Sequence, residues 1–314
     1  MKYGFGVDIG GTTVKLGCFR QDGALLKQWE IPTRTELGGD VIFDDISGAV
    51  LSCAEGLGIA RQDVLGLGVG IPGPVDDGGN VNCCVNLKLG VFNLRQTLES
   101  RTGLAVRAGN DANLAALGEY YDGGGRGSQS MLMVTIGTGV GGGFVWNGRV
   151  LNGFHGVAGE LGHVTIDRDE PERCTCGKFG CAEQYASATG MVRLAKQRLA
   201  ACDTPSALRQ MPELTAKALF DCAGAGDALA LEVLERVYDV LGQAIADSCC
   251  ICDPELVVVG GGVSKAGQPL LDGIARHFAK YCFHAARSTR FALAKLGNSA
   301  GIYGGFRLIS GRET

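Results

Sequence analysis

The sequence predicts an α/β protein built from two similar halves, and three observations support this fold class. Apolar segments of strand length alternate with helical patterns along most of the 314 residues. The segment DIGGTTVKLGCF, from Asp8, and the segment TIGTGVGGGFVW, from Thr135, share a pattern of apolar run, Gly-rich turn and second apolar run. The Gly-rich segment at 122–128 is typical of a linker between domains. We therefore expect two halves joined by this linker, with a ligand in the cleft between them.

The elements expected in the first half follow from its apolar patterns. Breaks at Gly10-Gly11 and Asp22-Gly23 divide residues 2–33 into three predicted strands. The other elements expected in this half are a helix at 40–56, a strand within 64–76, a helix at 93–102, a strand at 105–108 and a helix at 111–121.

The second half opens like the first, with a strand, a Gly-rich turn and a strand within 131–153. The elements expected after it are a helical region at 183–252, a strand with a Gly-rich turn at 254–264, a helix, a strand at 290–297 and a helix at 299–309.

Composition and charge exclude several classes of protein. The net charge is −4 and the basic residues form no run, so the sequence lacks the positive footprint of a nucleic-acid-binding protein. No apolar stretch is long enough for a membrane span, and the N-terminus lacks the apolar core of a signal peptide. The 13 cysteines are odd in number, and a disulfide framework is not expected. We expect a cytoplasmic protein that binds neither nucleic acid nor membranes.

Three Gly-rich turns are candidates for binding anionic oxygens. The first turn and its flanks offer backbone N–H groups, hydroxyls, an ammonium group and a carboxylate, from Gly10, Gly11, Thr12, Thr13, Lys15 and Asp8. That carboxylate could reach a magnesium ion through water. The second turn is Gly137-Thr138-Gly139, and the third, Gly261-Gly262, stands at a strand-to-helix junction that favours phosphate or ribose oxygens.

A plain hairpin turn is the alternative for the first of these segments. Its repetition in the second half, together with the third Gly-rich turn, favours phosphate binding instead. The spacings of a P-loop and of a Rossmann fingerprint are both absent from the sequence.

Asn110 and Asp111 stand where a predicted strand meets a predicted helix. The simplest interpretation of Asp111 is an N-cap or a first-turn acid. A carboxylate at this end of a strand could also act as a general base toward a hydroxyl that attacks a phosphate. Asn110 would then fix the groups beside that hydroxyl.

The stretch RCTCGKFGCAE at 173–183 contains three cysteines, and a histidine precedes them in AGELGH at 158–163. One His and three Cys are a common ligand set for structural zinc, here His163, Cys174, Cys176 and Cys181. Free buried thiols or a redox pair are the alternatives, and the polar, Gly-containing loop disfavours buried thiols. The metal would join the loop that carries Glu160 to the loop that carries Glu183. Polar groups held this closely suit a sugar.

The motifs resemble those of the ROK family of sugar kinases in order and spacing, over nearly the whole chain. They are DIGGT at 8–12, GIPGPVD at 70–76, NDAN at 110–113, GTGVGGG at 137–143, AGELGH at 158–163 and CTCGKFGCAE at 174–183. The cysteine loop resembles those of the family's glucokinases and N-acetylhexosamine kinases. Many family glucokinases have Pro-Asn-Leu followed closely by Trp where this chain has Val85-Asn-Leu-Lys-Leu-Gly90.

The resemblance implies the actin-like ATPase fold, with two ribonuclease-H-like domains and the active site in the cleft between them. We expect a smaller domain at 1–122 together with the C-terminal helix at about 299–314, and a larger domain at 123–298. The resemblance further implies ATP and Mg²⁺ as cosubstrates, phosphorylation of a hexose at its 6-hydroxyl, and a homodimer ahead of a tetramer. Glucose is the first expectation for the hexose.

Individual roles also follow from the resemblance. Asp111 matches the family's general base. The sugar contacts matched are Gly73, Asn110, Asp111, Glu160, His163 and Glu183. The residues matched in the phosphate-binding turns are Gly11, Thr12, Thr13 and Lys15, together with Thr138 and Gly139. Gly261 and Gly262 match the adenosine side.

Several alternatives stay open at this level. The sugar could be N-acetylmannosamine, N-acetylglucosamine, mannose, allose or fructose, and polyphosphate could replace ATP as donor. A non-catalytic sugar-binding relative and an actin-like ATPase that acts on a protein partner are competing classes. The family's repressors carry a DNA-binding domain before DIGGT, for which the short N-terminal stretch leaves no room, so a repressor is not expected.

Overall fold

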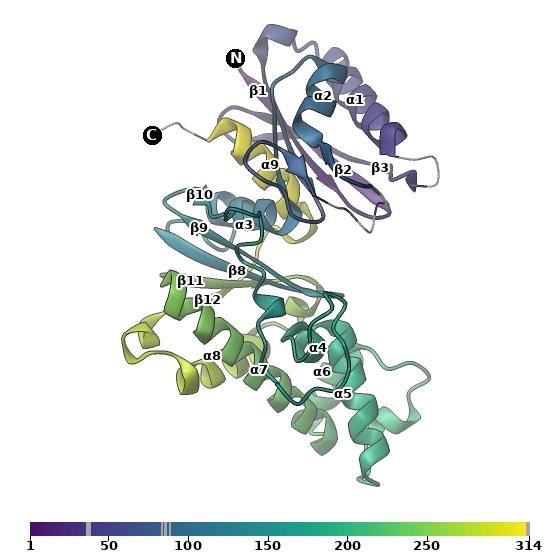
Figure 1. Cartoon of the computed structure of the whole chain (residues 1–314), viewed down its shortest axis with the longest axis vertical. Coiled ribbons are helices and arrows are strands. Elements are labelled where there is room, and N and C mark those ends of the chain that lie inside the picture. The colour runs from purple at the N-terminus through teal and green to yellow at the C-terminus, as the bar shows by residue number, and fades with distance from the viewer. Residues whose placement is uncertain (36–38, 83, 85–86, 88, 312–314) are drawn as a thin grey trace. The chain divides into compact units, whose positions relative to one another are not determined.

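The computed structural model describes residues 1–35, 39–82, 84, 87 and 89–311. The chain divides into two compact units (Figure 1). The first unit comprises Met1–Ser130, Gly143–Gly159 and the described residues from Leu296 onward, and the second comprises Met131–Gly142 and Glu160–Lys295. Residues 143–159 therefore cluster with the N-terminal part of the chain, whereas the sequence predicts them in the larger domain.

The first unit contains a five-stranded sheet in the order β3-β2-β1-β4-β7. Its strands are β1 (Tyr3–Ile9), β2 (Thr13–Arg20), β3 (Leu25–Pro32), β4 (Val64–Ile71) and β7 (Val106–Asn110). The first three strands form an antiparallel meander, and β4 runs parallel to both β1 and β7. A separate two-stranded sheet pairs β5 (Asn80–Val81) with β6 (Phe92–Asn93).

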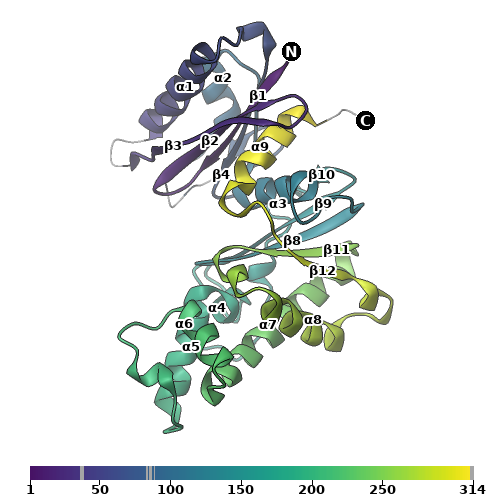
Figure 2. The same cartoon turned by 180° about the vertical axis from the view of Figure 1, so that it is seen from behind.

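Helices cover both faces of this sheet (Figures 1 and 2). They are α1 (Gly39–Gly56), α2 (Leu94–Thr102), α3 (Asp111–Asp122) and α9 (Ala300–Ser310), with the short 3-10 helices η2 (Arg61–Asp63) and η8 (Gly297–Ser299). Helices α1 and α2 share one apolar core with β1, β2 and β4. The opposite face receives α9, whose backbone comes very close to the sheet. A Cβ on Gly6 would lie 1.8 Å from the carbonyl oxygen of Ile302, so glycine is required there for this approach.

The second five-stranded sheet has the order β10-β9-β8-β11-β12, which repeats the order of the first. Its strands are β8 (Ser130–Ile136), β9 (Val140–Trp146), β10 (Arg149–Val150), β11 (Leu256–Gly260) and β12 (Arg290–Leu293). Strand β11 pairs parallel with both β8 and β12.

The helices of the second unit follow the cysteine-rich segment and alternate with short 3-10 turns. They are η4 (Leu161–His163), α4 (Glu183–Ala186), α5 (Ala188–Ala201), η5 (Ala207–Gln210), α6 (Ala216–Gly224), α7 (Ala228–Cys252), η6 (Gly262–Ala266), α8 (Gln268–Tyr281) and η7 (His284–Ser288). In the described part of the chain, no helix combines the length and the apolar composition that a membrane crossing requires.

The predicted α/β class is confirmed, as are the two halves that each open with a strand, a Gly-rich turn and a strand. Three details of the prediction are wrong. The helical region at 183–252 is interrupted between α5 and α6 and again before α7. The strand predicted at 290–297 ends at Leu293, and the turn after β11 leads into η6 before α8 begins. These errors lie at Gly, Pro and polar positions where local propensity is weak and tertiary packing decides the boundary.

Candidate functional site

The candidate residues of the first unit gather at the carboxyl ends of three adjacent parallel strands. Asp8 near the end of β1 is in register with Gly70 of β4, and Ile71 of β4 is in register with Asn110 of β7. Open α/β sheets bind ligands at this edge, because the loops that leave it are free to diverge. The sheet topology therefore brings Asp8 and Asn110 to one edge although they are far apart in sequence.

Asn110 directly precedes helix α3 and is its N-cap. Its Oδ1 accepts a hydrogen bond from the backbone N–H of Asn113 at 3.1 Å, and its Nδ2 donates to the carbonyl oxygen of Gly73 at 3.1 Å. Asp111 is the first residue of the helix, and its Oδ1 accepts from the N–H of Ala112 at 2.8 Å. Asp111 is therefore a first-turn acid, which is one form of the simplest interpretation, and the N-cap position is filled by the neighbouring Asn110.

The carboxyl group of Asp8 is influenced by a second carboxyl group and by an ammonium group at this edge. Burial raises the pKa of Asp8 to about 6, the negative charge of Asp111 adds to that rise, and Lys15 opposes it. Burial also raises the pKa of Asp111, and hydrogen bonds from the backbone N–H groups of Ala112 and Asp111 and from Asn110 partly offset this. Lys15 lies opposite Asp8 in the β1–β2 register. A carboxylate whose proton affinity is raised in this way is a better general base than an exposed one.

The first Gly-rich turn is anchored on its sheet side. The N–H of Gly10 donates to the carbonyl oxygen of Thr13 at 3.0 Å, and Thr33 at the end of β3 donates from its N–H to Thr12 at 2.9 Å and from its hydroxyl to Gly10 at 2.8 Å. A Cβ added to Gly11 would meet no atom of the described chain within 4 Å. The turn is thus held from one side and open on the other, as a phosphate cradle must be.

The second and third Gly-rich turns leave the carboxyl ends of β8 and β11, which are parallel neighbours. Helix α5 holds the second turn, because the N–H of Ala188 donates to the carbonyl oxygen of Gly137 at 2.8 Å and the hydroxyl of Thr189 donates to that of Thr138 at 2.9 Å. Gly261 in the third turn has a φ of 83°, which favours glycine.

A cavity of about 670 Å³ lies beside the second turn, in the second unit. Its wall comprises Thr138, one face of α5 between Ala188 and Lys196, and the segment from Met211 to Ala216.

Glu183, the first residue of α4, uses its carboxylate to hold the second turn. Its Oε2 accepts a hydrogen bond from the N–H of Val140 at 2.9 Å, and its Oε1 accepts from the hydroxyl of Thr175 at 3.3 Å. Sequence reasoning assigned Glu183 to the sugar and missed this contact. Nothing in the spacing indicates it, since the two residues are 43 positions apart.

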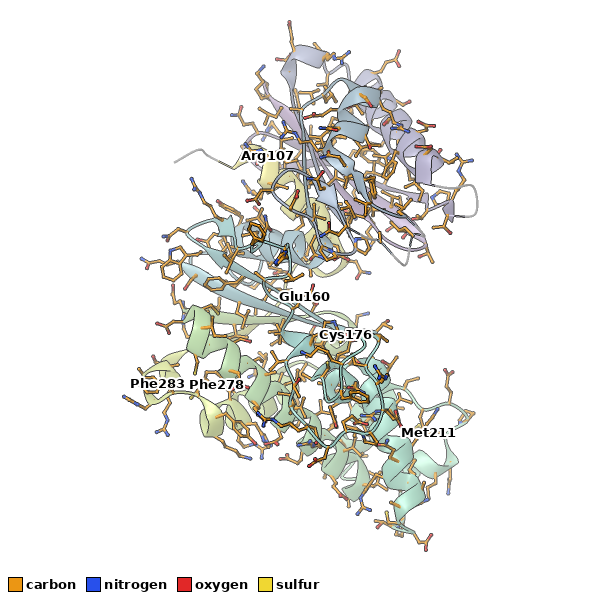
Figure 3. All side chains as sticks on the ribbon, viewed as in Figure 1. Arg107, Glu160, Cys176, Met211, Phe278 and Phe283 are labelled. Carbon is orange, nitrogen blue, oxygen red and sulfur yellow. The ribbon has the colours of Figure 1, made fainter. Side chains whose placement is uncertain are left out.

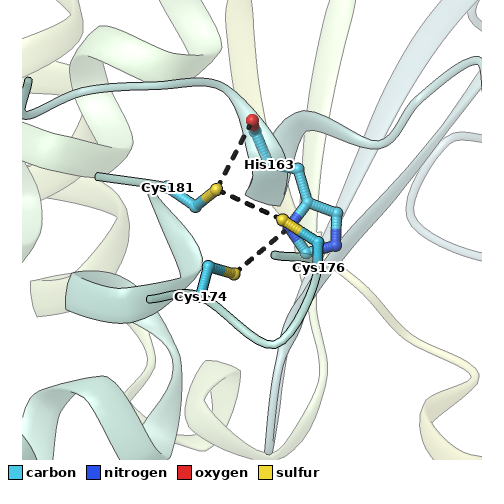
Figure 4. Close-up of side chains that lie close together, drawn as sticks. All are labelled: His163, Cys174, Cys176 and Cys181. Atoms are coloured by element: carbon cyan, nitrogen blue, oxygen red, sulfur yellow. Dashed lines mark hydrogen bonds between the residues drawn. The ribbon is translucent and has the colours of Figure 1, made fainter. Parts of the chain in front are cut away.

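The predicted cysteine and histidine ligands lie together (Figure 4). The ligand atoms of His163, Cys174, Cys176 and Cys181 all lie within 4.8 Å of one another. The Cys176 and Cys181 sulfurs are 3.6 Å apart, and the Cys174 sulfur is 3.7 Å from Nδ1 of His163. Tetrahedral zinc with bonds of about 2.3 Å to sulfur places two thiolates roughly 3.8 Å apart. The donor set and these separations fit a zinc ion.

The remaining predicted residues lie close to this cluster or outside the described part. Glu160 directly precedes η4, and its carbonyl oxygen accepts from the N–H of His163 at 3.0 Å. Glu160 and Cys176 are labelled in Figure 3. Val85, which stands where many family glucokinases have proline, lies outside the described residues, as do its neighbours Asn86 and Lys88.

Two sheets of the same strand order, each opened by a hairpin with a Gly-rich turn, define the two-domain actin-like ATPase fold. The chain belongs to the ROK family, whose family model matches residues 4–312.

Individual relatives cover almost the full length. The chain is 42% identical over 313 residues to a glucokinase of Halalkalibacterium halodurans, covering 98% of this chain and 95% of the relative. It is 32% identical to an N-acetyl-D-glucosamine kinase of Aliivibrio salmonicida, covering 97% of this chain and 98% of the relative. A solved ROK family glucokinase from Streptomyces griseus, in complex with glucose and AMPPNP, has a TM-score of 0.77 at 34% identity and covers 98% of both chains.

Proposed function

We propose that this protein is an ATP-dependent glucokinase, which transfers the γ-phosphoryl group of ATP to the 6-hydroxyl of glucose. The observation that carries this proposal is the partly buried Asp111 carboxylate at the carboxyl edge of the first sheet, beside Asn110 and a Gly-rich turn that is open on one side. The full-length similarity to a glucokinase supports glucose as the sugar.

Asp111 is the general base in the proposed reaction. Its carboxylate takes the proton of the 6-hydroxyl as the hydroxyl oxygen forms a bond to the γ-phosphorus, and the bond from that phosphorus to the β–γ bridging oxygen breaks to release ADP. Asn110 caps the helix that begins at Asp111, so it positions the carboxylate as well as offering its amide to the sugar. The raised pKa of Asp111 suits the role of base, since a base must hold the proton that it removes.

The Gly-rich turns are proposed to bind ATP. Gly10, Gly11, Thr12 and Thr13 offer N–H groups and hydroxyls to the phosphates, as do Gly137, Thr138 and Gly139, and Lys15 adds a positive charge. Asp8 is the residue that would hold Mg²⁺, through water, and the ion would neutralise charge on the transferred phosphoryl group. The cavity beside Thr138 has the size of a small-molecule site and suits the nucleoside, with Gly261 and Gly262 on the adenosine side.

The sugar contacts are proposed from the remaining residues. The backbone of Gly73 and the side chains of Asn110, Glu160, His163 and Glu183 offer donors and acceptors to the hydroxyls. Zinc on His163, Cys174, Cys176 and Cys181 is structural, because four protein ligands close its coordination sphere. Since Glu183 also binds the N–H of Val140, its carboxylate would link the sugar site to the second turn.

The test is the release of ADP by the purified protein with ATP, Mg²⁺ and a panel of hexoses. Glucose-dependent release is expected, and none should occur without sugar. A protein that retains zinc but forms no sugar phosphate from any hexose, with either ATP or polyphosphate as donor, would exclude the kinase and favour the non-catalytic sugar-binding class.

A second candidate substrate is N-acetylglucosamine, which the similarity to N-acetyl-D-glucosamine kinases favours. The same panel separates the two sugars, because a site shaped for the hydroxyl at C2 of glucose must enlarge to accept an acetamido group. A kcat/KM that is higher for N-acetylglucosamine than for glucose would transfer the proposal to that sugar.

A homodimer and a role in glycolysis stay predictions from the family resemblance, and a cytoplasmic location stays a prediction from the sequence. Light scattering of the purified protein measures the first directly, with a tetramer as the alternative outcome.

A further inference from the structure

A cavity of about 960 Å³ lies within the first unit, and none of the residues assigned above to sugar, phosphate or metal lines it. Its wall is formed by β7, α3, the turn between β9 and β10, and the C-terminal part of α9. Tyr121 of α3, with Val150 and Leu308, supplies an apolar surface, and the buried side chains of Leu114 and Leu117 lie behind it. The volume is that of a small-molecule binding site.

The cavity wall carries positive charge that the protein does not neutralise. Of its charged residues, Arg307 is paired with Asp122 and Asp22 with Arg20. Arg107 and Arg149 are exposed and form no ion pair with any residue that the structure describes, and Arg107 donates one hydrogen bond, to the carbonyl oxygen of Leu308 at 3.2 Å. Figure 3 labels Arg107, which comes from β7. Two guanidinium groups from separate strands, β7 and β10, therefore line one cavity without carboxylate partners.

We propose that this cavity binds a small organic phosphate ester. A phosphate monoester carries up to two negative charges and three terminal oxygens, which match two guanidinium forks better than a single carboxylate does. Leu308, Val150 and the Tyr121 ring accept the carbon body of the ester, and Asn147 at the wall offers hydrogen bonds to its polar substituents.

Residues that line the cavity connect it to the carboxyl edge of the first sheet, where Asn110 and Asp111 lie. Ala108 and Gly109 of β7 line the cavity immediately before Asn110 and Asp111, and Leu114 lines it three residues after Asp111. The lining residue Asn152 accepts a hydrogen bond from Nδ2 of Asn113 at 3.3 Å, and the N–H of Asn113 donates to the side chain of Asn110. Oδ1 of Asn113 is buried with no partner in the described part of the chain, so its amide is held through Asn152. A ligand that shifts Asn152 therefore changes the sugar affinity of the Asn110 edge, a consequence that rests on the proposed function.

Binding is measured by the fluorescence of Trp146, which precedes the cavity turn at Asn147. The chain has two tryptophans, so Trp29→Phe leaves Trp146 as the single reporter. Phenyl phosphate, glucose 6-phosphate and inorganic phosphate are titrated in the presence of saturating glucose and a non-hydrolysable ATP analogue, which occupy the proposed active site. Calorimetry on the same samples detects binding that leaves the indole emission unchanged.

We expect saturable binding of at least one ester, tighter than that of inorganic phosphate. The double variant Arg107→Ala/Arg149→Ala should weaken it by at least about tenfold, because each lost hydrogen bond to a charged group is worth more than one factor of ten. Arg287→Ala removes an exposed arginine of the second unit and serves as the matched control. Absence of saturable binding, equal affinity for inorganic phosphate, or unchanged affinity in the double variant would each overturn the site.

The coupling is measured separately, as the glucose dissociation constant with and without the best-binding ester. We expect a change of at least about fivefold, the usual lower range for coupled sites, and its loss in Asn152→Ala. An unchanged glucose affinity overturns the coupling. If the protein binds no sugar at all, the proposed function fails, while the arginine test of the cavity stands by itself.

Discussion

The carboxylate of Glu183 and the backbone N–H of Val140 are joined by a 2.9 Å hydrogen bond. This contact ties the helix that follows the Cys₃His cluster to the second Gly-rich turn. The same carboxylate accepts from Thr175, which stands between two of the cysteines. The cluster is therefore linked to the turn through one side chain. A substitution in the cluster should affect the turn, and a substitution in the turn should affect the cluster.

Gly139→Ala should disrupt this link. A Cβ at position 139 would lie 2.4 Å from Oε2 of Glu183, which is closer than any real contact of this type. The carboxylate is the end of a flexible side chain and can move aside, but it then loses its hydrogen bond to Val140. We therefore expect a melting temperature lower by a few degrees, from about 1 kcal/mol for the lost hydrogen bond. The KM for ATP should also rise. Differential scanning fluorimetry and steady-state kinetics provide the two measurements.

Gly137→Ala is the matched control in the same turn. A Cβ there would meet no atom of the described chain within 4 Å, so stability should stay within about 0.5 kcal/mol of the parent. Equal melting temperatures for the two variants would contradict the steric role of Gly139.

Cys176→Ser should remove the metal. The sulfur of Cys176 lies 3.6 Å from that of Cys181, and a serine hydroxyl is a poor zinc ligand. We expect about one zinc per chain in the parent and a large loss in the variant, measured by atomic absorption, with weaker glucose binding by calorimetry because the loop is no longer held.

Cys250→Ser replaces an exposed cysteine outside the cluster and should retain the parent zinc content. A zinc-free Cys176→Ser protein with unchanged glucose affinity would show that the metal does not shape the sugar site.

Asp111→Asn should lower kcat by roughly a hundredfold or more, the loss expected when a general base is removed. Glucose binding should be retained, since the amide keeps the size and hydrogen-bonding capacity of the carboxylate. Asp203→Asn, at an exposed position in the second unit, is the control. Parent turnover in Asp111→Asn would remove this residue from the role of base.

The pH dependence of kcat/KM should report the same group. Burial raises the pKa of Asp111, so the base becomes protonated at a higher pH than an exposed aspartate would. We expect activity to fall as the solution is acidified, above the ordinary titration range of a carboxyl group. An acid limb at the ordinary value for aspartate would contradict the burial argument.

Asp8→Asn should stabilise the protein at neutral and alkaline pH. The pKa of Asp8 is raised from 3.8 to about 6, so the folded state favours the protonated form. Ionised Asp8 therefore costs folding free energy above about pH 6, and this cost disappears as the pH falls toward 3.8. We expect a gain of about 1–2 kcal/mol at pH 8, after allowance for solvent screening, and almost none at pH 4.

At Asp22 the effect of the ionised carboxylate on stability should have the opposite sign, because hydrogen bonds from the Arg20 side chain and the backbone N–H of Ala24 lower its pKa. Asp22→Asn should therefore give no stabilisation at pH 8. If Asp8 also serves the Mg²⁺ site, the stabilised Asp8→Asn protein should be less active. An Asp8→Asn protein that is less stable than the parent at pH 8 would refute the proposed cost of burying the ionised Asp8 carboxylate.

Much of the fold could be predicted because its signals are local. Strands β1 and β2 follow from apolar runs on either side of Gly10 and Gly11, and α3 from a helical pattern that begins after a strand. The Cys₃His set could be predicted because three of its ligands lie within one short loop and ligand chemistry restricts the metal. The connection of these features with a sugar kinase came from the resemblance to the ROK family.

The sequence by itself determined the fold class, the repeated hairpins and the Cys₃His set, because periodicity, glycine and ligand spacing act over a few residues. Only the tertiary structure decided that Glu183 binds Val140, that Asn110 caps its helix while holding Gly73, and that Arg107 and Arg149 line one cavity. It also decided the raised pKa of Asp8, which depends on burial and on Asp111. Hydrogen bonds, desolvation and charge coupling join groups that are distant in the chain, so they exist only once the sheets and helices have brought those groups together.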